Sequence, residues 1–185
     1  MSEFLELEFK YKADDVKLSD FLKLMETLKV TKRLDVSSWD HYFVKSEDEF
    51  LRFRNGQNPE LTIKRKTKDT NNWNRVECDL PLDQSRITKD IVTKFAELEG
   101  YKENFSIYKT CFIFWLDNVN YVYYIVYDSN MKEQGRFIEV EINKSSLGNL
   151  TDPTEELKKQ EKLLEPLGIS PQNRMKKSLY EMFKK

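Results

Sequence analysis

The sequence predicts an α+β fold that is mainly β, with antiparallel strands arranged as a barrel or a sandwich. Apolar and polar residues alternate, with the period of a half-buried strand, in about eight stretches. Most connections between these stretches are short, and no strand–helix–strand rhythm is present, which favours antiparallel pairing. A chain of 185 residues suits a single domain, 1–185, with a buried core.

The spacing of hydrophobic residues, every second residue in strands and every three to four residues in helices, predicts where the individual elements lie. Alternation predicts strands at 3–12, 36–45, 49–54, 60–66, 73–80, 105–116, 120–128 and 135–143. Helical spacing predicts helices at 16–29, 84–98, 153–166 and 172–184. One face of the first helix is apolar, with Leu18, Phe21, Leu22, Met25 and Leu28. Pro166 and Pro171 mark the break before the last helix.

Composition excludes several classes of protein. The 31 basic and 32 acidic side chains nearly cancel, so we expect neither DNA nor a membrane as a partner. The N-terminus lacks the features of a secretory signal, and Cys78 and Cys111 are not spaced as a zinc or redox pair. We therefore expect a cytoplasmic protein, and the oligomeric state is left open. His41 is the only histidine, which makes a structural role the expectation for it.

Charged residues occupy one side of several predicted strands. Alternation puts Glu6, Glu8 and Lys10 on the same side of the first strand. The same rule pairs Arg52 with Arg54, Lys64 with Lys66, Arg75 with Glu77, and Glu139 with Glu141. A solvated outer face would explain any one of these strands. However, acids gather on the first and last strands and bases on the middle ones, which predicts a site with two poles.

Each pole indicates a ligand. Paired carboxylates that lie close together raise one another's pKa unless a cation neutralises them, and Mg²⁺ or Mn²⁺ suits such oxygen ligands. The bases exceed what a monophosphate needs, so a polyanion fits them better. The interior of an eight-stranded barrel has room for one small ligand. The basic candidates are Arg52, Arg54, Lys64, Lys66, Arg75 and Lys109.

A series of short motifs runs nearly the full length of the chain. In order they are Glu6-Leu7-Glu8-Phe9-Lys10, Asp40-His41-Tyr42-Phe43, Leu51-Arg52-Phe53-Arg54, Leu61-Thr62-Ile63-Lys64, Arg75-Val76-Glu77, Asp128 followed by Gly135-Arg136-Phe137-Ile138-Glu139-Val140-Glu141, and Lys177-Ser178-Leu179-Tyr180. In this ordered set the chain resembles the CYTH family, also called the triphosphate tunnel metalloenzymes. The ExExK motif alone is weak, whereas the whole series is specific.

The resemblance implies a closed eight-stranded antiparallel β-barrel with flanking helices, a requirement for Mg²⁺ or Mn²⁺, and substrates that carry a triphosphate. It implies that metal is held by Glu6, Glu8, Asp128, Glu139 and Glu141. It implies that phosphates are bound by Lys10, Arg52, Arg54 and Lys64, to which our reading of the strands adds Lys66, Arg75 and Lys109. The catalytic candidates are Lys10, Glu6 and Glu8.

The expected reaction is hydrolysis of inorganic tripolyphosphate or of an organic or nucleoside triphosphate. Metal-activated water would attack the terminal phosphoryl group in line. One alternative is a class IV adenylate or nucleotidyl cyclase, which makes a cyclic nucleotide and pyrophosphate. Another is a non-catalytic module that binds nucleotides or polyphosphate. A 5′-triphosphate end of RNA would need the same hydrolysis, but the near-neutral charge gives it no support.

One position departs from the family pattern. The family has K-x-R where this chain reads Lys109-Thr110-Cys111, so Cys111 stands in place of a phosphate-binding arginine. Loss of a charge-assisted contact costs on the order of 1.5–3 kcal/mol of binding, unless Lys66 or Arg136 replaces it. The substrate or the activity is therefore expected to differ from the family pattern.

Overall fold

The structure is a computed structural model of the chain, and it describes residues 5–66, 74–83 and 86–184. The eight strands are β1 (Leu5–Lys12), β2 (Lys32–Val44), β3 (Glu49–Gly56), β4 (Glu60–Lys66), β5 (Asn74–Pro81), β6 (Lys102–Trp115), β7 (Val119–Tyr127) and β8 (Glu133–Ile142). The helices are α1 (Leu18–Glu26), α2 (Lys89–Leu98), α3 (Pro153–Glu161) and α4 (Leu179–Phe183), with 3-10 turns η1 (Lys144–Asn149), η2 (Lys162–Leu167) and η3 (Pro171–Asn173). The predicted α+β, mainly β class is confirmed.

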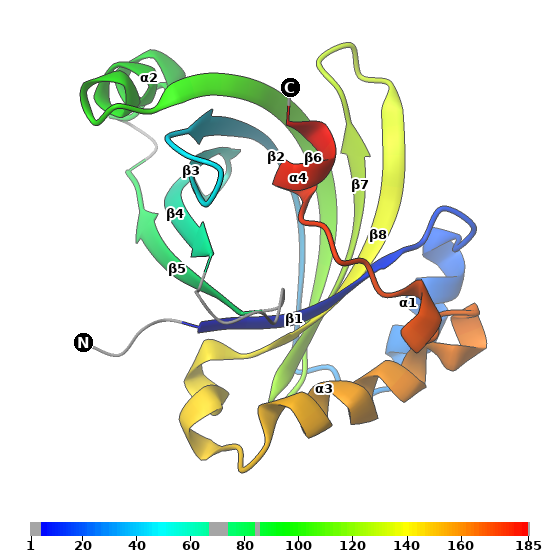
Figure 1. Cartoon of the computed structure of the whole chain (residues 1–185). Coiled ribbons are helices and arrows are strands. Elements are labelled where there is room, and N and C mark those ends of the chain that lie inside the picture. The colour runs from blue at the N-terminus through cyan, green and yellow to red at the C-terminus, as the bar shows by residue number, and fades with distance from the viewer. Residues whose placement is uncertain (1–4, 67–73, 84–85, 185) are drawn as a thin grey trace.

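All neighbouring strands are antiparallel, in the order β1-β5-β4-β3-β2-β6-β7-β8, and β8 returns to β1 (Figure 1). The sheet is strongly curled. Among the described residues, β1 and β5 pair at three positions and β2 and β6 at thirteen. The C-terminal segment lies along β1. The Met175 amide donates a hydrogen bond to the Lys10 carbonyl at 2.7 Å. Arg174 and Tyr11 form an isolated antiparallel β-bridge.

Several elements differ from the prediction: β6 begins three residues earlier, and α2 and α3 are shorter than expected. Strand β2 begins four residues earlier than expected, because Lys32–Asp35 pair with the end of β6. The predicted helix 172–184 is reduced to α4, because residues near Arg174 run extended beside β1. Ser178 then starts the helix: its hydroxyl accepts from the Glu181 amide, and the Glu181 carboxylate accepts from the Ser178 amide.

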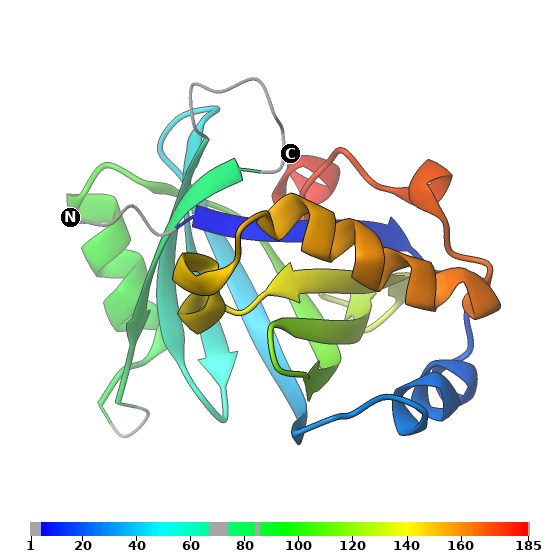
Figure 2. The same ribbon diagram turned by 90° about the horizontal axis from the view of Figure 1, so that it is seen from below.

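The hydrophobic core lies largely outside the barrel, between the sheet and its helices. Outward-facing aromatic residues of β1 and β7 pack with apolar residues of α1 and α3: Phe9, Tyr11, Tyr121, Tyr123, Phe21, Met25 and Leu157. A second cluster joins β2 and β3 to α2: Phe43, Leu51, Phe53, Val92 and Ala96. Figure 2 shows α3 lying along β1 and β8. Because the apolar sides of these strands face the helices, their polar sides are left to face the interior.

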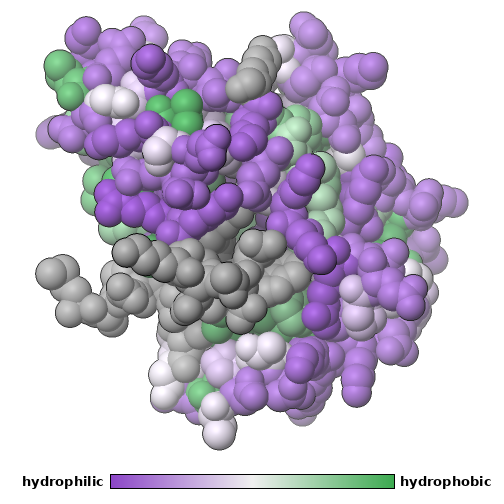
Figure 3. Space-filling view, viewed as in Figure 1, coloured by the Kyte–Doolittle hydropathy of each residue, from purple (hydrophilic) through white to green (hydrophobic). Residues whose placement is uncertain are grey.

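The surface seen in the view of Figure 1 is mostly hydrophilic, with hydrophobic side chains in small separate groups (Figure 3). Exposed apolar residues of α2 include Ile91, Phe95 and Leu98. Within the described part of the chain, no helix has the length and apolar character that crossing a bilayer requires.

Candidate functional site

The barrel encloses a cavity of about 360 Å³, within the range of small-molecule sites, roughly 300–1,000 Å³. Side chains from all eight strands reach it, and Ser178, Leu179 and Tyr180 line it near the C-terminus. The inward faces of all eight strands therefore converge on one space, and those of β1, β3, β4, β5, β6 and β8 bring charged groups to it.

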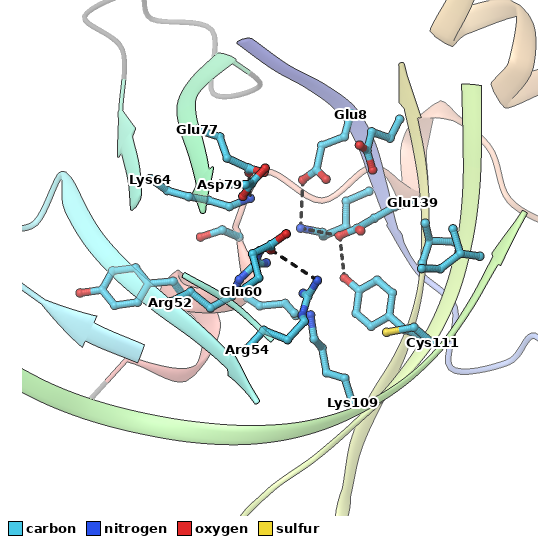
Figure 4. Close-up of a pocket in the computed structure, with 18 of the residues that line it drawn as sticks. Glu8, Arg52, Arg54, Glu60, Lys64, Glu77, Asp79, Lys109, Cys111 and Glu139 are labelled. Atoms are coloured by element: carbon cyan, nitrogen blue, oxygen red, sulfur yellow. Dashed lines mark hydrogen bonds and ion pairs between the residues drawn. The ribbon is translucent and has the colours of Figure 1, made fainter. Parts of the chain in front are cut away.

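Carboxylates from β1 and β8 form one side of this cavity. Register places Glu8 beside Glu141 and Lys10 beside Glu139. The Lys10 ammonium lies between two of these acids, 3.1 Å from Glu8 Oε1 and 2.8 Å from Glu139 Oε1. Figure 4 shows Glu8 and Glu139 on this side of the cavity. Tyr124 donates its hydroxyl to Glu139 at 2.8 Å. Burial alone would raise the pKa of Glu139, but the charge and hydrogen bond of Lys10, together with the Lys109 charge and the Tyr124 hydrogen bond, lower that pKa.

On the acidic side, a cationic side chain of this protein, Lys10, lies between the carboxylates. Among the described residues, no group of three or more His, Cys, Asp or Glu side chains is arranged to hold a metal ion by itself. The carboxylates of Glu8 and Glu139 instead share the Lys10 ammonium. The two acids are thus already placed around one positive charge.

Guanidinium and ammonium groups from β3, β4 and β6 form the other side: Arg52, Arg54, Lys64 and Lys109. Asp40 of β2, which is completely buried, forms ion pairs with two of them, Arg54 and Lys109. Arg54 donates Nε and Nη2 to the two oxygens of Asp40, at 3.0 and 3.2 Å. Lys109 Nζ lies 2.7 Å from Asp40 Oδ2. The bidentate contact fixes the orientation of Arg54, and the same carboxylate holds the ammonium of Lys109.

Burial and mutual attraction shift the pKa values of Asp40 and Lys109. Burial would raise the pKa of Asp40, but the charges of Arg54 and Lys109 hold that pKa well below its usual range. Burial lowers the pKa of Lys109, and the attraction of Asp40 offsets this only in part. Asp40 therefore stays ionised, and its charge partly compensates the buried ammonium of Lys109 and the partly exposed guanidinium of Arg54.

Carboxylates also lie among the bases, which the sequence reading did not include in the site. Arg52 Nη2 contacts Glu60 Oε1 at 3.0 Å, and Lys64 forms an ion pair with Glu77. Among the described residues that line the cavity, five are cationic, namely Lys10, Arg52, Arg54, Lys64 and Lys109. Six are carboxylates, namely Glu8, Glu60, Glu77, Asp79, Glu139 and Glu141. The cavity is consequently close to neutral rather than basic.

Cys111 faces the cavity next to Lys109 on β6, as its predicted position requires (Figure 4). The residue is 8% exposed, and burial raises the pKa of its thiol in spite of the nearby cations. The thiol is therefore protonated near neutral pH and is a poor nucleophile.

The structure brings eight of the predicted site residues to this cavity: Glu8, Lys10, Arg52, Arg54, Lys64, Lys109, Glu139 and Glu141. The side chains of Glu6 and Arg75 lie outside the described residues. Lys66 does not line the cavity, because it ends β4 and its ammonium lies 3.1 Å from Glu181.

Asp128 is not brought to the cavity either. A register shift between Val126 and Tyr127 interrupts the alternation just before it. Its carboxylate accepts hydrogen bonds from the Asn130 and Lys132 amides and from the Gln134 side chain. This residue stabilises the turn between β7 and β8, a role that its position after a strand did not reveal.

Sequence reasoning left out several residues that belong to the site. Strand alternation already pairs Glu77 with Arg75, and the same rule puts Asp79 on that side of the strand and Glu60 on the same side as Lys64. Asp40 belongs to the Asp40-His41-Tyr42-Phe43 motif, but its buried contacts with β3 and β6 depend on the register of three strands.

The overall course of the chain matches solved structures. The PH1012 protein of Pyrococcus horikoshii is 21% identical, over 97% of this chain and 99% of its own, with a TM-score of 0.74. A Vibrio parahaemolyticus protein described as a "putative adenylate cyclase" is 16% identical over 96% and 97%, with a TM-score of 0.68. The RNA triphosphatase domain of a mimivirus mRNA capping enzyme is 14% identical over 90% of both chains, with a TM-score of 0.51.

The chain has the fold of these proteins. This agrees with the resemblance to the CYTH family seen in the sequence motifs. No protein-family model matches the chain, and no curated protein matches it in sequence.

Proposed function

We propose that this chain, as one domain over residues 1–185, is a divalent-metal-dependent hydrolase of triphosphate substrates. The observation that carries the proposal is the opposition of two kinds of side chain across one cavity. Glu8, Glu139 and Glu141 face the bases held by Asp40. The fold likeness to an RNA triphosphatase domain supports the same chemistry.

The charge balance of the cavity supports metal dependence. A triphosphate carries several negative charges, and the five cations that line the cavity are already matched by six carboxylates. Mg²⁺ is commonly held by one or two carboxylates, with phosphate oxygens and waters completing its shell, so Glu8, Glu139 and Glu141 suit it. Glu6 is proposed as a fourth ligand from its sequence position. Bound there, Mg²⁺ or Mn²⁺ would neutralise phosphate oxygens and lower the pKa of a coordinated water.

The bases have a separate task. Arg52, Arg54, Lys64 and Lys109 would bind the phosphate oxygens and stabilise negative charge on the transferred phosphoryl group. Asp40 would keep Arg54 and Lys109 aimed into the cavity, so that little reorganisation accompanies the reaction. Lys10 would orient the attacking water or a phosphate, because its ammonium lies at the acidic side.

A nucleotidyl cyclase is the second candidate. The Vibrio protein of the same fold favours it, since a cyclase would use the same bases and acids on a nucleoside triphosphate. The products distinguish the two reactions: hydrolysis at the terminal phosphorus gives orthophosphate and a diphosphate, and cyclisation gives a cyclic nucleotide and pyrophosphate.

The test is incubation of the purified chain with tripolyphosphate, ATP, GTP or thiamine triphosphate, with Mg²⁺, Mn²⁺ or EDTA, and separation of the products. We expect orthophosphate and a diphosphate with metal, and no reaction with EDTA. Glu141→Gln should lose most of this activity and keep the fold, whereas Glu97→Gln on the exposed face of α2 should behave as wild type. Absence of cleavage under every condition, or full activity in Glu141→Gln, would overturn the proposal.

A further inference from the structure

The wall of the cavity that β6 and β7 supply differs from the rest. Along β6 the inward row changes from Lys109 to the apolar or weakly polar residues Cys111, Ile113 and Trp115. On β7, Val122 lies opposite Ile113 in the register. These neighbouring strands give the cavity an apolar wall, whereas β1, β3, β4, β5 and β8 each give it charged groups.

One polar group interrupts this wall. Asn120 of β7 lines the cavity and pairs in register with Trp115 on one side and Glu141 on the other. Its Oδ1 atom is buried and has no hydrogen-bond partner among the described residues. A buried acceptor without a donor is unfavourable for the folded chain, so its presence in a ligand cavity indicates a partner supplied by the ligand.

Inorganic tripolyphosphate would not use this wall. Its surface consists of charged or polar oxygens, and those placed against Ile113 and Val122 would lose water without gaining a hydrogen bond. A triphosphate that carries an organic group would bury that group on the apolar wall and leave its phosphates to the bases.

We propose that the β6–β7 wall is a subsite for a planar ring that bears an N–H donor, the chemistry of a nucleobase, joined to the triphosphate. The inference rests on the proposed function and names its substrate class as a nucleoside triphosphate. Trp115 supplies an aromatic surface for stacking, and Asn120 Oδ1 accepts the hydrogen bond, as asparagine does from the amino group of adenine. Cys111 leaves room there that an arginine would fill.

The test compares ATP with tripolyphosphate in the presence of metal. For each variant we would measure kcat/KM for both substrates, and the dissociation constants of a non-hydrolysable ATP analogue and of tripolyphosphate. Asn120→Leu and Trp115→Leu should each lower the preference for the nucleotide, as a ratio to tripolyphosphate, by roughly tenfold, the equivalent of ~1.4 kcal/mol. Matched controls on the outer face of the barrel are Asn55→Leu and Trp39→Leu. They should leave unchanged both the ratio of kcat/KM values and the ratio of dissociation constants for nucleotide and tripolyphosphate.

A structural role predicts a different result. Replacing a buried amide whose oxygen is unpaired by an apolar side chain of similar size should not destabilise the chain, so the melting temperature of Asn120→Leu should equal or exceed that of wild type. A lower melting temperature without a change in the ratios would overturn the subsite. So would weaker Mg²⁺ binding by Asn120→Leu in the absence of nucleotide, because it would make Asn120 a metal ligand beside Glu141.

The two proposals fail separately. If tripolyphosphate and ATP are both cleaved and the variants change them equally, the subsite is wrong and the hydrolase stands. If no triphosphate is cleaved, the hydrolase is wrong, and the binding ratios still decide the subsite: equal ratios in all variants overturn it, and a tenfold loss supports it.

Discussion

At the scale of single residues, Asp40 shows how a buried charge can orient others. It contacts no solvent and pairs with Arg54 and Lys109, which both line the cavity. Removal of one partner from such a cluster leaves the remaining charges buried without compensation, which is more damaging than the net contribution of the pairs suggests. Asp40 is therefore proposed as a positioning residue for the phosphate-binding bases.

Asp40→Asn should lower the free energy of unfolding by about 3–5 kcal/mol near pH 7. The pKa of Asp40 is lowered in the folded chain, so its stabilisation is present above the usual aspartate value of 3.8 and is lost as pH falls below it. The difference between variant and wild type in urea unfolding should thus shrink in acid. Asp35→Asn, at an exposed ion pair on the same strand, is the control and should cost less than 1 kcal/mol. Equal stability of the two variants would contradict this assignment.

Cys111 permits a test by addition of charge. Cys111→Arg would place a guanidinium beside Lys109 and fill part of the apolar wall. We expect kcat/KM for tripolyphosphate to rise roughly tenfold, about 1.4 kcal/mol, and the preference for ATP to fall. Steady-state kinetics with both substrates measures this. Cys111→Ser, which adds no charge, serves as the control, and identical kinetics in the arginine variant and wild type would show that position 111 does not contact substrate.

At the scale of elements, α4 depends on tertiary contacts. A helix of five residues is not stable alone, so its order comes from its cap and from docking. Tyr180 stacks on Phe50, with ring centroids 4.5 Å apart, and lies 6.1 Å from the ring of Phe105. These contacts place α4 beside the cavity, which Ser178 to Tyr180 line.

Tyr180→Ala should release α4 while the barrel stays folded. We expect hydrogen exchange of the amides in 179–183 to become at least tenfold faster, roughly 1.4 kcal/mol, and the amides of β7 to keep their protection. Mass spectrometry of exchanged peptides measures both. Tyr127→Ala, at a tyrosine of β7 outside the α4 cluster, is the control and should leave α4 protected. Unchanged exchange in Tyr180→Ala would show that other contacts hold this helix.

At the scale of the whole molecule, the barrel places charge inside and much of its apolar core outside. The helices cover the outer apolar faces, so the interior can hold ionised groups without supplying the main hydrophobic stabilisation. The cost of gathering these charges is offset by pairs such as Lys64 with Glu77. A ligand that completes the charge balance should therefore stabilise the entire fold.

A triphosphate with Mg²⁺ should raise the melting temperature. At a ligand concentration about one hundred times Kd, binding to the native state adds about 2.7 kcal/mol, a rise of roughly 5–10 °C for a domain of this size. Differential scanning calorimetry with a non-hydrolysable ATP analogue measures it. Orthophosphate with Mg²⁺ should give a smaller rise, and the absence of any shift with triphosphate would argue against a binding site in the barrel.

The sequence by itself determined the fold class, the eight strands and most of the charged lining. Alternation is a local property, so it placed Glu8, Lys10, Arg52 and Glu139 on the inward faces of their strands before any contact was known. It could not place Asp128, because a shift in register interrupts the alternation ahead of it.

Only the tertiary structure decided which groups meet. The pairing of Asp40 with Arg54 and Lys109 depends on the register of β2 with β3 and β6, which no local pattern encodes. The acids among the bases, the Asn120 oxygen without a partner among the described residues, and the docking of the C-terminal segment on β1 likewise arise from residues far apart in sequence. Hydrogen bonding between strands fixes these distances, and with them the chemistry that the cavity can perform.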